Sequence, residues 1–144
     1  MIITKIPMAS YHLIFGAGVV GQAIMKQLLA QGQPVMMVNR SGRGPWPAEV
    51  AYRQGDVRDA DFVRTLAREA AVVYQTLNAP YHRWPQDFPP MQAGLLAGMR
   101  GLGVPLVVLE NVYMYGDTEG QPMWEDTPMQ ATTRKGRVRA AMSR

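Results

Sequence analysis

The 144-residue chain contains no cysteine, no long apolar run and few charged side chains. Without cysteine there is neither a disulfide framework nor thiolate chemistry, so cysteine usage does not define a redox compartment. No stretch reaches the ~18–20 consecutive apolar residues of a membrane span. The first residues combine one lysine with an apolar stretch broken by Pro7, which is unlike a signal peptide. We therefore expect a cytoplasmic protein with no membrane partner.

The composition, 47% hydrophobic and 18% charged, is typical of a globular protein, and the charged residues are unevenly distributed along the chain. The formal net charge is +4, yet the last eleven residues hold five basic side chains and no acidic one. These are Arg134, Lys135, Arg137, Arg139 and Arg144. A basic helix could contact nucleic-acid phosphates. Because no stacking aromatics or known nucleic-acid motif accompany it, we do not expect nucleic-acid binding.

Residues 13–21 read LIFGAGVVG, an apolar strand that runs into the pattern G-x-G-x-x-G. In this pattern the first glycine allows a tight turn, the second lets the backbone approach a pyrophosphate, and the third lets the following helix pack closely. The helix N-terminus adds free N–H groups and a partial positive charge. We predict dinucleotide binding by six residues: Gly16, Ala17, Gly18, Val19, Val20 and Gly21.

Strand-like and helix-like segments alternate along the chain. We expect strands at 11–15, 35–38, 50–53, 71–74 and 104–109, and helices at 19–31, 59–68, 91–102 and from about 132. This alternation implies an α/β fold, a Rossmann-type doubly wound parallel sheet in the order 3-2-1-4-5. The whole chain is predicted to be a single dinucleotide-binding domain, with an N-terminal extension at 1–10 and a basic, truncated helix at 130–144.

The pattern stops inside a helix after the fifth strand, whereas a full doubly wound dinucleotide fold continues to a sixth strand and a place for substrate. We expect either a truncated form that lacks the C-terminal strands or a minimal cofactor domain. The minimal domain would have an exposed sheet edge that a partner would cover. Together with the methionine-rich helix at 91–102, this edge makes a homo-oligomer possible.

The end of the second expected strand favours NADP over NAD. In NAD-selective folds a carboxylate at this place binds the ribose 2′-hydroxyl, whereas an arginine accommodates the 2′-phosphate of NADP. Here the sequence is Asn39-Arg40-Ser41-Gly42-Arg43, with two arginines and no acid. A guanidinium suits a phosphate. The alternative is a solvated loop with two incidental arginines.

Four segments, taken in order, resemble the NAD-dependent epimerase/dehydratase family, which belongs to the extended and atypical short-chain dehydrogenase/reductases. They are the motif at 16–21, Asn39-Arg40-Ser41, Gly55-Asp56-Val57-Arg58-Asp59, and residues 110–116. The resemblance covers roughly residues 11–142. It implies an NAD(P)-dependent oxidoreductase that transfers hydride at a sugar-like secondary alcohol.

The same resemblance implies roles for residues after the third and fourth strands. Asp56 and Val57 would line the adenine pocket, although Asp56 could simply end a strand in a turn-like sequence. Thr76 and Leu77 would approach the nicotinamide ribose. Three residues, Tyr81, His82 and Trp84, could face the substrate. A lone histidine in such a loop is more often a surface or packing residue than a base.

The catalytic positions of the family are altered in this chain. Extended members use a serine or threonine, a tyrosine as general acid/base, and a lysine four residues after the tyrosine. The resemblance places Asn111, Thr133 and Arg137 at these positions. Threonine has no ionised form near neutral pH, so it cannot perform the proton transfer of a phenol.

Two other tyrosines could replace the missing phenol. Tyr113 and Tyr115 follow the fifth strand, and Lys135 is a candidate cation, although packing at the strand end is the favoured interpretation for both tyrosines. We therefore predict a chain that binds NADP or NAD and turns over little alone. The alternative is a non-enzymatic regulatory or interaction module that senses NADP.

Overall fold

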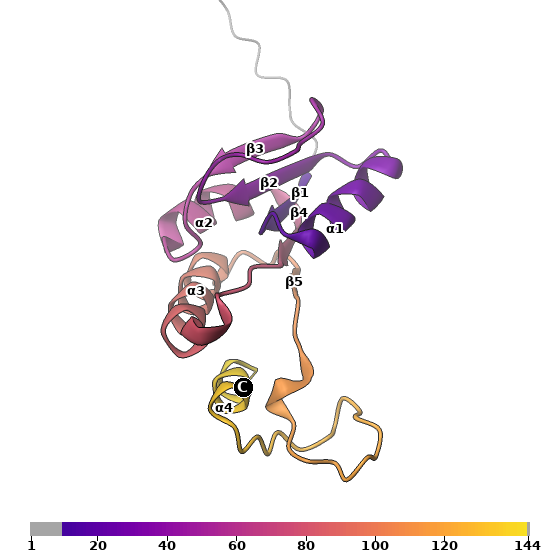
Figure 1. Ribbon diagram of the computed structural model, residues 1–144. Coiled ribbons are helices and arrows are strands. Elements are labelled where there is room, and N and C mark those ends of the chain that lie inside the picture. The colour runs from indigo at the N-terminus through magenta and orange to yellow at the C-terminus, as the bar shows by residue number, and fades with distance from the viewer. Residues whose placement is uncertain (1–9, 144) are drawn as a thin grey trace, which may run out of the picture. The chain divides into compact units, whose positions relative to one another are not determined.

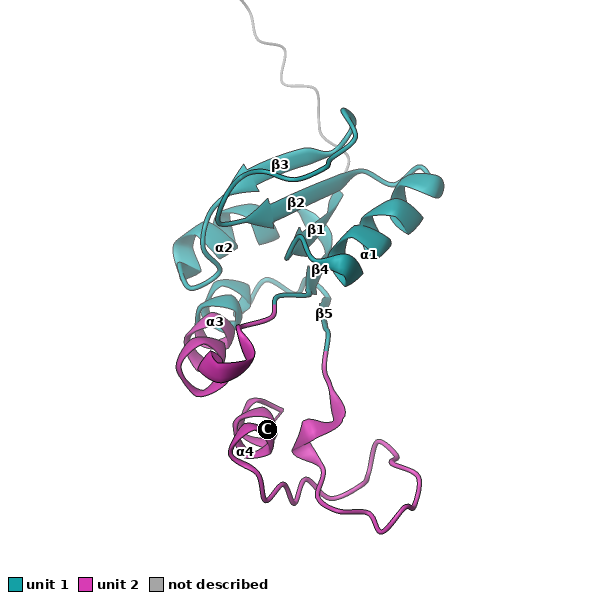
Figure 2. Cartoon of the chain, in the orientation of Figure 1, with its two compact units in different colours: residues 1–77, 94–109 teal, residues 78–93, 110–144 magenta. Residues whose placement is uncertain are grey.

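The computed structural model describes residues 10–143 (Figure 1). Apart from Ser10, the expected extension at 1–10 lies outside this part of the chain, as does Arg144. The chain separates into two compact units, shown in different colours in Figure 2. Unit 1 holds the residues up to 77 together with 94–109, and unit 2 holds residues 78–93 and 110–144.

Unit 1 is built on a five-stranded sheet in the order β3-β2-β1-β4-β5, and each strand pairing is parallel. The strands are β1 Tyr11–Phe15, β2 Val35–Asn39, β3 Ala51–Gln54, β4 Ala70–Gln75 and β5 Leu106–Val108. The helices of unit 1 are α1 Val19–Ala30 and α2 Ala60–Ala67. Helix α3, Trp84–Met99, begins in unit 2 and ends in unit 1, and α4, Arg134–Met142, belongs to unit 2. The predicted Rossmann-type strand order is confirmed, and the fifth strand is shorter than predicted.

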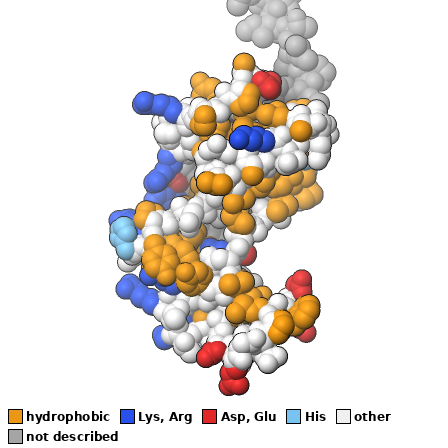
Figure 3. Space-filling view, turned by 45° about the vertical axis from the view of Figure 1, so that its right-hand side comes forward, with side chains coloured by type: hydrophobic (Ala, Val, Ile, Leu, Met, Phe, Trp, Pro, Cys, Tyr) orange, Lys and Arg blue, Asp and Glu red, His pale blue; other side chains and the backbone are white. Residues whose placement is uncertain are grey.

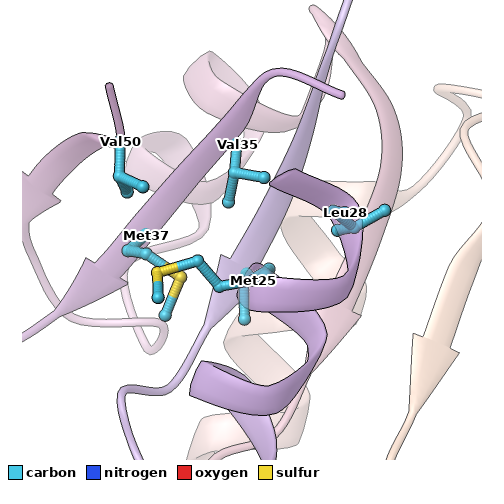
Figure 4. Close-up of a cluster of buried hydrophobic side chains, with 6 residues drawn as sticks. Met25, Leu28, Val35, Met37 and Val50 are labelled. Carbon is cyan, nitrogen blue, oxygen red and sulfur yellow. The ribbon is translucent and has the colours of Figure 1, made fainter. Parts of the chain in front are cut away.

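Helices cover both faces of the sheet in unit 1. On one face Ile14 and Met37 pack with Met25 of α1, and Figure 4 shows the side chains of Met25 and Met37 lying against one another between helix and sheet. Successive side chains of a strand point to opposite faces. Accordingly, the hydroxyl of Tyr11 donates a hydrogen bond at 2.7 Å to the carbonyl of Leu66 in α2. The near-continuous burial of β1 and β2 follows from this double cover.

Two glycines of α3 allow a close approach to α2. A Cβ on Gly98 would lie 2.6 Å from the Cβ of Val63, and a Cβ on Gly94 would lie 2.5 Å from the Cα of Arg58. Real side chains do not tolerate such distances, so any larger residue would push the helices apart. Gly98 therefore lets α3 pack closely on α2, and Gly94 lets it pack closely on the turn that precedes α2.

The helix predicted at 91–102 begins earlier than the sequence indicates. It starts at Trp84 and contains Pro89 and Pro90, so the predicted start at Met91 is wrong. Two prolines remove two backbone donors from the helix interior. Burial of Trp84 and Phe88, which are 4% and 2% exposed, opposes this cost. Each large buried side chain contributes about 1.5–3 kcal/mol.

Unit 2 has its own small apolar cluster. Its members are Ala79, Trp84 and Phe88, with Met91, Val138 and Met142 packed against them. Arg139 lies beside this cluster, 2% exposed, with its guanidinium carbon 4.7 Å from the ring centroid of Phe88. It also forms an ion pair with Glu110 at 2.5 Å. Arg139 is therefore a structural residue, with its guanidinium held inside unit 2.

Hydrophobic side chains are also exposed, as the orange areas of Figure 3 show. Those of unit 1 include Leu96, Val107 and Leu109, which are 47%, 49% and 45% exposed. β5 is an outer strand of the sheet, so the predicted exposed edge is present there. Among residues 10–143, no helix is long and apolar enough to cross a membrane.

Candidate functional site

The turn between β1 and α1 is held closed by contacts that only glycine permits. Gly16 has φ +116°, and a Cβ there would lie 2.6 Å from the Oγ1 of Thr76. A Cβ on Gly21 would collide with the carbonyl oxygen of Gly16. The Thr76 hydroxyl is 3.1 Å from the carbonyl oxygen of Phe15 and 3.3 Å from that of Gly16, within donor distance of both. The first and third glycines of the motif therefore serve the fold itself.

The middle glycine of the motif faces open space. Gly18 is the N-cap of α1, and a Cβ there would have no heavy atom within 4 Å. Val19 and Val20 beside it are 87% and 40% exposed. The first turn of α1 carries no acidic residue, and no side chain caps it within the part of the chain that is described. The unpaired N–H groups and the helix dipole therefore point to a position suited to an anion.

The end of β4 lies against this turn. The backbone nitrogen of Leu77 would be 3.0 Å from a Cβ on Gly16, and the backbone nitrogen of Thr76 donates to the carbonyl of Phe15 at 2.8 Å. The carbonyl of Ala17 accepts a hydrogen bond at 2.9 Å from the side chain of Gln22. The predicted residues of the motif, together with Thr76 and Leu77, thus form one group at the C-terminal ends of β1 and β4.

The loop after β2 folds around the side chain of Asn39. Its Oδ1 accepts a hydrogen bond from the backbone of Gly42 at 2.7 Å and one from the hydroxyl of Ser41 at 3.3 Å, and its Nδ2 donates to the carbonyl of Arg43 at 2.8 Å. Asparagine commonly organises turns in this way. Asn39 therefore shapes the loop, and Arg40 within it is exposed.

The end of β3 lies beside this loop. The backbone nitrogen of Gly55 donates to the carbonyl of Asn39 at 3.1 Å, and the side chain of Gln54 donates to the carbonyl of Arg40 at 3.0 Å. The next residue, Asp56, is half-buried, whereas Val57 is only 4% exposed. The predicted adenine-end residues therefore meet at the C-terminal ends of β2 and β3, on the sheet edge where α/β folds bind ligands.

Asp56 has a partner that the sequence interpretation missed. The guanidinium of Arg58 donates from Nε to both carboxylate oxygens at 3.0 Å and from Nη2 to Oδ2 at 2.5 Å. These hydrogen bonds are the main cause that lowers the pKa of Asp56, and the charge of Arg40 adds to it. The signal was available, because an arginine two residues after an aspartate in a turn is within reach of its carboxylate.

In unit 2 the three positions that match the family triad have local backbone partners. The hydroxyl of Thr133 accepts a hydrogen bond from the nitrogen of Gly136 at 3.0 Å and so caps α4. Asn111 accepts from the nitrogen of Tyr113 at 3.1 Å. Arg137 is exposed and donates to the carbonyl of Thr132 at 2.7 Å. In this arrangement the Thr133 hydroxyl stabilises the start of a helix.

A second group in unit 2 joins phenols and a cation. The hydroxyls of Tyr81 and Tyr113 lie 3.4 Å apart, and the Nζ of Lys135 is 3.7 Å from the ring centroid of Tyr81. Trp84 packs edge-on against both tyrosines. The hydrogen bond to Tyr81, the electrostatic interaction with the same phenol and desolvation raise the pKa of Tyr113. The positive charge of Lys135 lowers it. The Tyr113 phenol is therefore neutral near pH 7 and a poor base.

The remaining candidates are less engaged. Tyr115 is half-buried, and its backbone nitrogen donates to the carbonyl of Val112 at 3.3 Å. His82 lies exposed in the short 3₁₀ turn Tyr81–Arg83. Their catalytic roles stay predictions. Among residues 10–143, no group of three or more His, Asp or Glu side chains could hold a metal ion.

Comparison with known proteins gives a curated relative and solved structures that share the fold. No family model matches the chain. The UDP-glucose 4-epimerase of Streptomyces lividans is 28% identical over 148 residues, covering 92% of this chain and 45% of the relative. The chain therefore spans about half the length of the curated relative that it matches.

Solved structures share the fold over a similar span. The Bordetella bronchiseptica enzyme WbmG, solved with NAD and UDP, superposes with a TM-score of 0.77 at 21% identity, over 94% of this chain and 48% of that one. Uronate dehydrogenase from Agrobacterium tumefaciens gives a TM-score of 0.74 at 18% identity, over 94% and 54%. Sequence and fold together confirm the resemblance predicted from the motifs, to the NAD-dependent epimerase/dehydratase family of extended short-chain dehydrogenase/reductases.

Proposed function

We propose that unit 1 binds a dinucleotide, NADP in preference to NAD, as the cofactor domain of an epimerase/dehydratase-type oxidoreductase. The observation that carries this proposal is the asymmetry of the glycine turn. Gly16 and Gly21 are required by contacts inside the protein, whereas the space beside Gly18 is open and lies at an uncapped helix N-terminus. An open glycine at that place is what close approach of a phosphate needs.

Different residues at the sheet edge would contact different parts of the dinucleotide. The N–H groups at residues 18–20 would bind the pyrophosphate, and Arg40 would bind the 2′-phosphate. Asp56 and Val57 would lie at the adenine, and Thr76 and Leu77 at the nicotinamide ribose. When bound, the nicotinamide supplies hydride transfer, and the protein contributes position and electrostatics.

The substrate class is proposed from the relatives. The structure of MoeE5 was solved with UDP-glucose and NAD, and that of WbmG with UDP and NAD. We therefore propose a sugar-like, nucleotide-linked substrate for the whole protein. We also propose that the 144-residue chain alone turns over little, because the Thr133 hydroxyl at the position of the family's tyrosine caps α4. Robust NADPH-dependent reduction of a carbonyl by this chain would contradict that.

A second candidate function follows from the helix cap formed by Thr133. With a threonine that caps a helix in place of a phenol, the protein could serve as an NADP-sensing regulatory or interaction module. The two functions differ in what changes with cofactor state. A sensor binds a partner protein with different affinity when it is loaded with NADP⁺ and with NADPH. An enzyme domain instead gains activity when it is fused to a segment that corresponds to the C-terminal half of its relatives.

Cofactor preference is tested at Arg40. Arg40→Ala should weaken NADP⁺ binding by on the order of tenfold and NAD⁺ binding much less, since a charge-assisted hydrogen bond contributes about 1.5–3 kcal/mol. Arg68→Ala is the matched control. Arg68 is an exposed arginine that directly follows α2, and its substitution removes the same positive charge. Equal losses for both dinucleotides in Arg40→Ala would show that Arg40 does not read the 2′-phosphate.

A further inference from the structure

The turn between β3 and α2 carries a closed ion pair. Besides the three guanidinium contacts to the carboxylate of Asp56, the backbone nitrogen of Arg58 donates to its Oδ1 at 3.0 Å. Both oxygens of the carboxylate are thus engaged by one residue two positions further along the chain. The side chains of Arg58 and Asp56 are 47% and 31% exposed, so the pair lies at the surface rather than in the core.

This pair adjoins the loop that carries Arg40. The hydrogen bonds from Gly55 to Asn39 and from Gln54 to Arg40 join the ends of β3 and β2 one and two residues before Asp56. These two contacts bring the backbone of Arg40 next to the residues that directly precede Asp56, and the charge of Arg40 is accordingly one of the causes that lower the pKa of Asp56. Without Arg58, the ionised carboxylate would be the natural partner of Arg40 and would repel a phosphate bound there.

We infer that Arg58 is a specificity-determining residue, which holds the Asp56 carboxylate and thereby leaves Arg40 to a 2′-phosphorylated adenosine. The inference rests on the proposed binding of NADP at this edge. Free carboxylates near the adenosine ribose favour NAD, because they accept hydrogen bonds from the 2′-hydroxyl and repel the 2′-phosphate. Asp56 is proposed to lie at the adenine rather than at the 2′-position, so it acts there only through its charge, which the arginine of the same turn balances. Arg58 thus acts on the ligand through Asp56.

The experiment is a calorimetric titration with NADP⁺ and NAD⁺ of four proteins: the unsubstituted chain, Arg58→Ala, Asp56→Asn and the double variant. At low ionic strength Arg58→Ala should lower the preference for NADP⁺ over NAD⁺ by on the order of tenfold. The double variant, which lacks both charges, should regain the original preference to within about threefold. The effect of Arg58→Ala should shrink in about 0.5 M salt because the pair is exposed. Arg58→Gln keeps most of the side-chain stem and should behave as Arg58→Ala does.

Two results would overturn the inference. An unchanged preference in both Arg58 variants would show that Asp56 is not held away from Arg40 by Arg58. A double variant that is as impaired as Arg58→Ala would show that Arg58 contacts the phosphate itself. Failure of the proposed function is seen separately, because then the unsubstituted chain binds neither dinucleotide.

Discussion

Gly18→Ala is expected to remove most dinucleotide binding while the protein stays folded. The backbone of Gly18, with φ −74° and ψ −173°, is in a region open to alanine, and its Cβ would meet no heavy atom within 4 Å. Two small effects on stability oppose each other. Alanine restricts the unfolded chain, which stabilises by about 0.4–1 kcal/mol, whereas glycine is the better N-cap by about 0.5–1 kcal/mol. The free energy of unfolding should therefore change by less than about 1 kcal/mol.

The effect on binding is larger, because the added methyl group enters the space proposed for the pyrophosphate. A phosphate displaced from the helix N-terminus loses charge-assisted hydrogen bonds of about 1.5–3 kcal/mol each, so the dissociation constant should rise at least about tenfold. Isothermal titration calorimetry measures this loss, and urea denaturation measures the stability. Unchanged affinity in a folded Gly18→Ala protein would refute the placement of the phosphate.

Gly32→Ala provides the matched control. Gly32 follows the other end of α1, has φ +70°, and also has open space around its missing Cβ. Alanine in a left-handed conformation costs about 1–2 kcal/mol, so this variant should lose stability and keep its affinity for the dinucleotide. Gly18→Ala should therefore lower the affinity and keep the stability, whereas Gly32→Ala should lower the stability and keep the affinity.

Three further predictions concern stability. Burial raises the pKa of Tyr11 above 10, so the folded protein holds the phenol proton more tightly, and this contribution to the free energy of unfolding is full below about pH 10 and is lost as pH rises through the raised pKa. Tyr11→Phe should destabilise by about 0.5–1.5 kcal/mol at pH 7, because the carbonyl of Leu66 loses the phenol and keeps only the longer hydrogen bond from the backbone nitrogen of Glu69, and should flatten the alkaline loss; an unchanged alkaline slope would contradict this. Gly98→Ala should cost about 1–3 kcal/mol through its collision with Val63, and Val63→Ala, which removes the colliding Cγ1 but keeps Cβ, should relieve only part of that cost in a double variant; a thermal melt that shows no loss would contradict the close approach. Thr133→Ala should cost about 1 kcal/mol as a lost N-cap, with Thr133→Ser nearly neutral; equal losses in chemical denaturation would contradict the cap.

The features that follow a local pattern were predictable from the sequence. Alternating apolar runs and helical stripes gave the parallel sheet and its order, and the motif at 16–21 gave the turn between β1 and α1. The start of α3 was not predictable in this way. Local propensity places Pro89 and Pro90 outside a helix, whereas the packing of Phe88 within unit 2 keeps them inside one.

The candidate site was predictable as positions along the chain and less so as contacts. That residues 39–40 contact residues 54–55, directly before 56–57, follows from parallel strands whose ends share one edge of a sheet. Two other features depend on side-chain geometry, which a pattern of residue types does not contain. They are the hydrogen bonds of Asn39 within its own loop and those of Arg58 to the carboxylate of Asp56. The same holds for Thr133, whose hydroxyl is a helix cap.

The central claim, that the turn between β1 and α1 binds a dinucleotide at the edge carrying Arg40, is tested most directly on the unsubstituted chain. The measurement is a calorimetric titration with NADP⁺ and, separately, with NAD⁺ at one fixed salt concentration. We expect one dinucleotide to bind per chain, with NADP⁺ the tighter of the two. Binding of neither dinucleotide by the folded chain would contradict the account.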